Sequence, residues 1–157
     1  MKTYVLATFC ALALTFAVPT TSQARLGETK AECEKRYGEA VETGGVFMGA
    51  DTNSIYHKNG FLIVVGYIDG ICTFVAFTKP GEYTNQEMSE HEIKTLMEAN
   101  SNGQRWTQTA RGNWSLPDGS VAVFTYGSNQ LSFATQGFVS KMNERTKAKE
   151  SKNLEDF

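Results

Sequence analysis

The sequence has few of the residues from which metal and redox sites are built. Its 157 residues include three cysteines and two histidines, His57 and His91. A protein zinc site needs three or four ligands at close spacing, and a redox-active dithiol is typically Cys-x-x-Cys. Neither pattern occurs, so we expect no metal and no cofactor.

Catalytic signatures are also missing. The chain has no Gly-x-Ser-x-Gly elbow, no phosphate-binding Gly-Lys-Ser/Thr loop and no dinucleotide-binding glycine motif. Asp51, Asp69 and Asp118 fall in predicted turns, where aspartate has a structural use. We therefore expect a protein that is not an enzyme, although a carboxylate pair formed in space would be invisible in the sequence.

The chain also lacks an excess of positive charge. Fifteen Lys and Arg stand against seventeen Asp and Glu, which gives a formal charge of −2. A nucleic-acid binder is expected to carry a clustered basic surface. The composition therefore predicts no nucleic-acid partner.

The first 24 residues have the features of a signal peptide. Lys2 precedes an apolar run from Tyr4 to Val18, and Ser22-Gln23-Ala24 fits the small-x-small cleavage rule. The run is shorter than the ~20 residues of a membrane span, although an uncleaved anchor is the alternative. We expect cleavage after Ala24, a periplasmic or secreted protein, and no later span.

One hairpin organises the remaining chain. Residues 61–77 (FLIVVGYIDGICTFVAF) form two apolar runs joined by Asp69-Gly70, which is typical of a type I′ turn. Such a turn predicts these facing pairs: Ile68–Ile71, Tyr67–Cys72, Val65–Phe74 and Ile63–Ala76. Both faces of the hairpin are apolar, so each must be covered. We expect helices on one face, and the other half of the chain or a partner on the other.

Two capping boxes mark helix starts. Thr29 with Glu32 predicts a helix over residues 30–37, and Ser89 with Glu92 predicts a second over about 90–100. Short strands are expected at 54–58, 106–109, 113–116, 120–126 and 130–136, with the last near an edge of the sheet.

These elements predict an α+β fold in which two short helices pack on an antiparallel β-sheet. The expected order is helix, β-hairpins, helix, β-hairpins, followed by a short C-terminal helix or tail. We expect one domain over residues 25–142, in which 25–80 and 81–142 echo each other, and a polar flexible tail over 143–157.

Two cysteines remain after the expected cleavage, Cys33 and Cys72. In an oxidising compartment an even pair indicates a disulfide, which would stabilise the fold by ~3–4 kcal/mol. Such a bridge would place the first helix on the sheet face that carries Tyr67 and Cys72. The alternative is a pair of buried free thiols.

Large aromatic side chains offer one candidate binding surface. Trp106 and Trp114, together with Tyr83 and Tyr126, could form an aromatic recognition patch. The alternative is that they belong to the core.

Leu26-Gly27-Glu28-Thr29, Cys33 and Tyr37-Gly38, followed by strands with Asn59-Gly60 and Asp69-Gly70, resemble two protein families. These are the SmpA/OmlA (BamE-like) family and the family of the beta-lactamase inhibitory protein. The SmpA type usually continues Gly-x-Pro and has a lipid-bearing N-terminal cysteine, and both features are absent here. The whole chain also looks like uncharacterised exported bacterial proteins. The resemblance implies a protein-binding role without a cofactor.

We therefore expect a non-catalytic protein–protein interaction module of the cell envelope or extracellular space. The alternative is a small-ligand-binding or hydrolytic protein with a pocket between the two halves of the chain.

Overall fold

The computed structural model describes residues 25–80 and 87–155, so the predicted signal peptide lies outside the described residues. Within them the chain forms three α-helices: α1 (Lys30–Tyr37), α2 (Glu90–Ala99) and α3 (Gln136–Glu155). It also forms eight strands: β1 (Glu42–Gly44), β2 (Thr52–Lys58), β3 (Phe61–Ile68), β4 (Ile71–Thr78), β5 (Thr107–Ala110), β6 (Asn113–Ser115), β7 (Val121–Thr125) and β8 (Gln130–Ala134).

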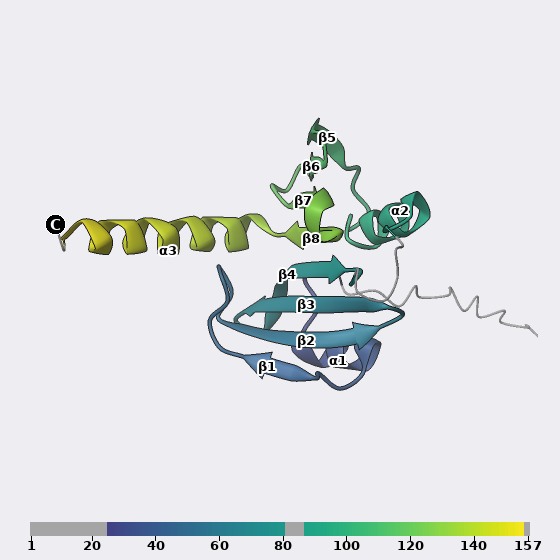
Figure 1. The fold of residues 1–157 in the computed structure, drawn as a ribbon, viewed down its shortest axis with the longest axis horizontal. Coiled ribbons are helices and arrows are strands. Elements are labelled where there is room, and N and C mark those ends of the chain that lie inside the picture. The colour runs from purple at the N-terminus through teal and green to yellow at the C-terminus, as the bar shows by residue number, and fades with distance from the viewer. Residues whose placement is uncertain (1–24, 81–86, 156–157) are drawn as a thin grey trace, which may run out of the picture.

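All eight of these strands belong to one sheet, in the order β1-β2-β3-β4-β8-β7-β6-β5 (Figure 1). Every neighbouring pair is antiparallel. Strands β1 to β4 make one half and β5 to β8 the other, and the halves join where β4 pairs with β8. The sheet is therefore continuous across both halves of the chain.

This architecture corrects the predicted fold class. We expected two short helices on an antiparallel β-sheet, in the order helix, β-hairpins, helix, β-hairpins, followed by a short C-terminal helix or tail. The described residues instead form one continuous eight-stranded sheet with three helices, and the longest, α3, has 20 residues. Strand β8 corrects a second expectation, because it lies between β4 and β7 at the middle of the sheet and not near an edge.

The local signals for helix starts are confirmed. Thr29 and Glu32 form a complete capping box at α1, and Ser89 and Glu92 form one at α2. Gly38 follows α1 with a φ of 94°, a conformation that glycine adopts without strain. Each box satisfies amide groups that would otherwise lack a partner at the helix start.

The central hairpin has the predicted turn but a different register. Asp69 and Gly70 have φ values of 51° and 76°, as a type I′ turn requires. Tyr67 faces Cys72 as expected, but the register then shifts, so Val65 faces Val75 and Ile63 faces Phe77. The predicted pairs with Phe74 and Ala76 are therefore wrong.

A β-bulge causes this shift. Thr73 is the extra residue on β4, and its Oγ1 lies 3.4 Å from the carbonyl oxygen of Gly66. A bulge moves every later side chain of its strand to the opposite face. Phe74 and Ala76 consequently pack on one side of the sheet, and Val75 and Phe77 pack on the other.

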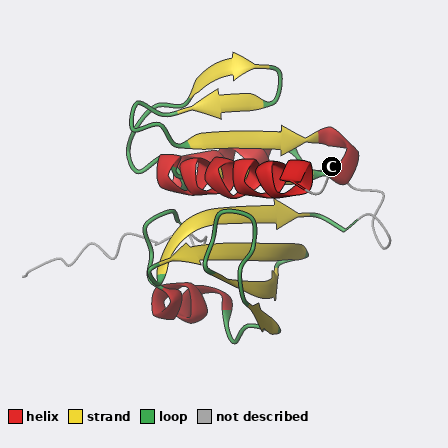
Figure 2. Cartoon of the chain, turned by 90° about the vertical axis from the view of Figure 1, so that its left-hand side faces the viewer, coloured by secondary structure: helices red, strands yellow, loops and turns green. Residues whose placement is uncertain are grey.

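The helices cover the two sides of the sheet very differently. Helices α1 and α2 bury Cys33, Tyr37, Leu96 and Met97 against one face, in the larger core cluster. On the other face, the first turns of α3 place Phe138 against Phe74, with their ring centroids 4.8 Å apart. Figure 2, viewed from the side toward which α3 projects, shows α3 in front of the seam between the two groups of strands.

Ion pairs fix α3 to the segment between β1 and β2. Lys141 Nζ lies 2.7 Å from Asp51 Oδ1, and Arg145 Nη2 lies 3.0 Å from the same oxygen. Arg145 Nη1 also donates to the carbonyl oxygens of Met48 and Ala50. We call Asp51, Lys141 and Arg145 the α3 clamp.

Beyond the clamp, α3 continues away from the sheet (Figure 1). Residues 146–152 are all exposed. We expected residues 143–157 to form a flexible tail, but residues 143–155 form the second part of this helix. Its polar composition is explained by its exposure, because a helix that contacts nothing needs no apolar stripe.

Candidate functional site

The face of the sheet opposite α1 and α2 is only partly covered by the described chain. Cross-strand pairing places two rows of side chains on it, each spanning β2, β3, β4, β8 and β7. One row is Ile55, Val64, Ala76, Ser132 and Val123, and the other is His57, Leu62, Thr78, Gln130 and Thr125. With a strand spacing of about 4.8 Å, each row is ~19 Å long.

We call these two rows, without the buried Ala76, the open face. None of its nine residues is buried, and Val123 is 36% exposed. The next row of this side, toward α3, is buried. Its residues Phe74 and Ala134 face each other across β4 and β8 and pack under Phe138. Helix α3 therefore covers one end of this side of the sheet, where Val64 also packs, and leaves the open face partly accessible. His57, Val123 and Thr125 are exposed, and its other six residues are half-buried.

The open face carries no Lys, Arg, Asp or Glu side chain. Its residues are aliphatic, hydroxyl-bearing or amide-bearing, with one histidine. Two of its polar side chains are held in place: Gln130 Nε2 donates to Thr78 Oγ1 at 2.9 Å, and Ser132 Oγ donates to the carbonyl of Val123 at 3.3 Å. Charged residues are depleted from the centres of protein interfaces, so this composition fits a docking surface.

The sequence did not reveal the open face as a set of residues. The bulge at Thr73 places the later side chains of β4 on the side of the sheet opposite to the expected one. In addition, β8 was expected near an edge but lies in the middle of the sheet. The available signal was the alternation in β8, which indicates that Leu131 and Phe133 point inward and that Ser132 and Ala134 point outward. This holds for the first three of these residues, but Ala134 is buried under Phe138.

The structure brings Cys33 and Cys72 together but does not join them. Both are free thiols with no exposed surface. The expected disulfide is therefore not formed in this structure, which has the arrangement of the alternative, two buried free thiols. Helix α1 nevertheless lies on the face of Tyr67 and Cys72, as the bridge would have required.

The two thiols influence each other strongly. A hydrogen bond with Cys72 lowers the pKa of Cys33, whereas the same bond together with burial raises the pKa of Cys72 well above its usual value. Nearby, the hydroxyl oxygens of Tyr56 and Tyr67 are 3.1 Å apart, and burial raises the pKa of both phenols. These groups form a polar cluster within the core under α1.

The tryptophans belong mainly to the core. Trp106 Nε1 donates to the carbonyl oxygen of Met97 at 2.8 Å, and its ring centroid lies 5.8 Å from that of Phe133. Trp114 is half-buried and packs against the same cluster. Tyr126 is exposed on the chain after β7, and Tyr83 lies outside the described residues. Trp106 and Trp114 thus lie on the helix-covered side, away from the open face.

A hollow of about 640 Å³ lies where the two halves meet. It is lined by residues 25–28, just before α1, and by residues 98–103 at the end of α2. The side chain of Asn100 is already used there, because its Oδ1 accepts from the Leu26 amide and its Nδ2 donates to the Leu96 carbonyl. Neither tryptophan lines this hollow.

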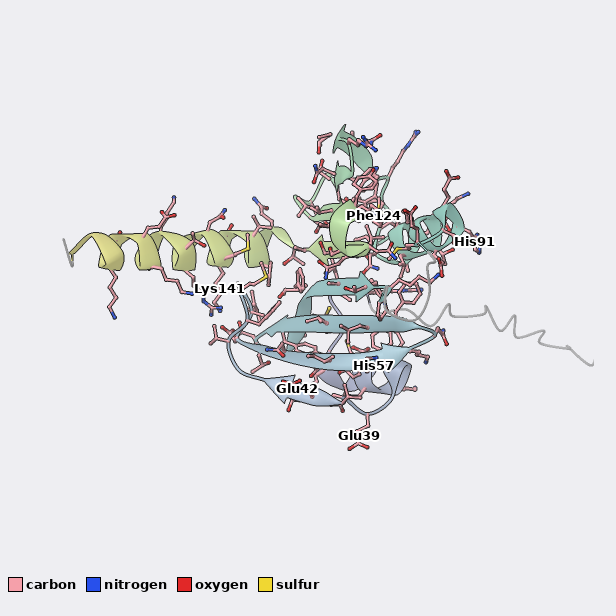
Figure 3. The ribbon with its side chains drawn as sticks, viewed as in Figure 1. Glu39, Glu42, His57, His91, Phe124 and Lys141 are labelled. Carbon is pink, nitrogen blue, oxygen red and sulfur yellow. The ribbon has the colours of Figure 1, made fainter. Side chains whose placement is uncertain are left out.

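The histidines lie far apart on the surface. His57 is on β2 and His91 is in the first turn of α2, and both are exposed (Figure 3). Among the residues that the structure describes, no group of three or more His, Cys, Asp or Glu side chains could hold a metal ion. In the same residues, no helix has both the length and the apolar character needed to cross a bilayer.

Comparisons with known proteins add little. No family model matches the chain, and no curated protein matches it. One structural neighbour is the crystal structure of a cysteine-rich secretory protein from Staphylococcus aureus subsp. aureus Mu50, with a TM-score of 0.39 and 11% sequence identity. The alignment covers 71% of this chain and 43% of that protein, and a likeness this weak carries no argument. The resemblance to the SmpA/OmlA (BamE-like) and beta-lactamase inhibitory protein families therefore stays a prediction.

Proposed function

We propose that this protein is a non-catalytic interaction module that docks a protein partner on the open face. The supporting observation is an uncharged sheet surface, five strands wide, that the described chain leaves partly accessible. In a chain in which 20% of the residues are charged, nine residues would carry about two charges on average, and the open face carries none. Burial of its aliphatic side chains by a partner would be favourable.

The proposed place of action is the cell envelope or the extracellular space. This part of the proposal rests on residues 1–24, where Lys2, the apolar run and Ser22-Gln23-Ala24 have the pattern of a cleaved leader. A partner would then be another envelope or extracellular protein.

Affinity capture with paired surface variants tests the docking surface. The full-length chain with a C-terminal tag would be expressed in its native host, mildly crosslinked and recovered from envelope and culture medium. We expect one stoichiometric partner, which Val123→Glu reduces at least about tenfold because it places a charge in the contact. Ile71→Glu is the matched control, since Ile71 is 37% exposed but lies at the β3–β4 turn.

Two results would contradict the proposal. One is a partner that Val123→Glu retains, which would move the contact to another surface. The other is a chain that recovers no partner in either fraction.

A small ligand in the hollow between residues 25–28 and 98–103 is the second candidate. Its volume of about 640 Å³ is in the range of small-molecule sites. A thermal-shift screen against metabolites would test binding, and release of the alcohol from model esters would test hydrolysis. A genuine ligand should lose its effect in Ala99→Trp, where the larger side chain would fill the hollow, and keep it in Val123→Glu.

A further inference from the structure

The regions around the two edge strands of the sheet carry opposite charges. Strands β1 and β5 are the outermost strands of the described sheet and lie at opposite ends of it in Figure 1. Residues 38–50 around β1 contain two charged side chains, Glu39 and Glu42, and Figure 3 shows Glu39 pointing away from the sheet. Residues 103–117 around β5 also contain two, Arg105 and Arg111. All four side chains are exposed.

Strand β5 has the properties of an edge open to another strand. Within the described residues it pairs only with β6, and all four of its residues, Thr107–Ala110, are exposed. Of the devices that prevent edge pairing, β5 lacks charged residues and proline, but it is short and its pairing with β6 is irregular between Gln108 and Ala110. Its outer backbone groups, which face away from β6, are available for hydrogen bonds.

Exposed apolar side chains flank the other edge. Val41 precedes β1 and is 61% exposed, and Val46 follows it and is 71% exposed. Large aliphatic groups so exposed on both ends of one edge strand would gain from burial by a neighbour. Strand β1 thus offers an extended segment with apolar ends and negative charge.

The strand directions make these two edges compatible. Because all eight strands alternate in direction, β1 and β5 run in opposite directions. A second copy in the same orientation therefore places its β1 antiparallel to β5 of the first, and the hydrogen-bonding pattern continues. In that pairing, the start of β1, with Glu39 and Glu42, lies beside the end of β5, where Arg111 follows.

We propose that the β5 edge receives the β1 edge of a second copy, so that the sheet continues head to tail between copies. Pairing of like edges is disfavoured, because β5 against β5 brings arginines together and β1 against β1 brings glutamates together. The paired strands have only three and four residues, so the contact is small and association is weak and salt-dependent. The proposal does not rest on the open face.

Sedimentation measurements test the pairing. The protein is expressed from the full-length sequence and purified in the form that the host produces. We expect concentration-dependent association that falls with added salt. Glu42→Arg and Arg111→Glu should each lower the association constant at least about tenfold, because each places like charges together. The double variant Glu42→Arg/Arg111→Glu should recover it to within about threefold, since the attraction is restored with reversed signs.

Matched controls separate this pairing from other occupants of the edge. Glu144→Arg changes the net charge as Glu42→Arg does but lies on α3, and it should leave association unchanged. Circular dichroism would confirm that each variant is folded. The proposal fails if the wild-type chain stays monomeric at all concentrations, if Glu42→Arg has no effect, or if the double variant does not recover. Loss with Arg111→Glu but not with Glu42→Arg would indicate that Arg111 meets an acidic segment other than β1.

Discussion

At Gly66 two layers of the molecule approach too closely for any side chain. A Cβ atom added there would lie 2.9 Å from the Cβ of Ala50 and 3.3 Å from the Cβ of Phe74. These atoms belong to short or buried groups, which cannot move aside without shifting backbone. The absence of a side chain at this position therefore lets the segment before β2 lie flat on β3 and β4.

Gly66→Ala tests this contact. We expect it to lower the free energy of unfolding by about 1–3 kcal/mol, the usual cost of overpacking a buried site. Gly127→Ala is the control, because no atom lies within 4 Å of its added Cβ, and its stability should change by less than about 1 kcal/mol. Urea unfolding followed by circular dichroism measures both, and equal stabilities for the two variants would show that the layers can separate freely.

Among the elements, α3 depends most on residues distant in sequence. Its first turns are held by Phe138 on Phe74 and by the α3 clamp, in which Arg145 contacts Asp51 across 94 positions. Hydrogen bonds from Lys141 lower the pKa of Asp51, and Arg145 adds to the effect. The clamp is therefore strongest when Asp51 is ionised.

The pH dependence of α3 docking follows from the direction of this pKa shift. The pKa of Asp51 is lower in the folded protein than in the unfolded chain. Its contribution to the free energy of unfolding is therefore complete when the pH is above the pKa of the unfolded chain. This contribution is lost as the pH falls through the lowered pKa of the folded protein. Asp51→Asn removes the carboxylate at every pH.

We therefore expect Asp51→Asn to be less stable than wild type near pH 7 and to approach it in acid. Urea unfolding of the two proteins between pH 7 and pH 3 measures this difference. Amide hydrogen exchange at pH 7 should also speed up in residues 136–146 of the variant, while β2 and β3 stay protected. A stability difference that is constant with pH would show that the charge of Asp51 does not contribute.

At the scale of the whole molecule, the two halves share one core. Phe133 on β8 lies at their junction, with its ring centroid 6.3 Å from that of Phe77 in the first half and 5.8 Å from that of Trp106 in the second. It has no exposed surface. Without the other half, each half would expose the apolar side chains that its strands place on the face covered by α1 and α2.

Phe133→Ala should consequently weaken both halves together. We expect a loss of about 3–5 kcal/mol, as for other fully buried phenylalanines. Tryptophan fluorescence reports on the second half, where Trp106 and Trp114 lie, and far-ultraviolet circular dichroism reports on the whole chain. The two unfolding curves should coincide in both proteins, whereas separate transitions would show that the halves unfold independently.

The sequence predicted the parts of this fold that depend on neighbouring residues. Capping boxes and Asp-Gly or Asn-Gly turns act within four residues, so both helix starts and the β2–β3 and β3–β4 hairpins could be located. The bulge at Thr73, the central position of β8 and the docking of α3 depend on contacts across the chain. Two of these determine which side chains form the open face, and that surface could therefore not be predicted.

The central position of β8 has a consequence for how the protein is made. Synthesis proceeds from the N-terminus, so β1 to β4 are complete more than fifty residues before β8, which starts at Gln130. During that interval the long apolar strand β4 is an unpaired edge, and such edges invite pairing between nascent chains. Folding speed should be limited by this late, long-range closure, and conditions that delay it should increase aggregation.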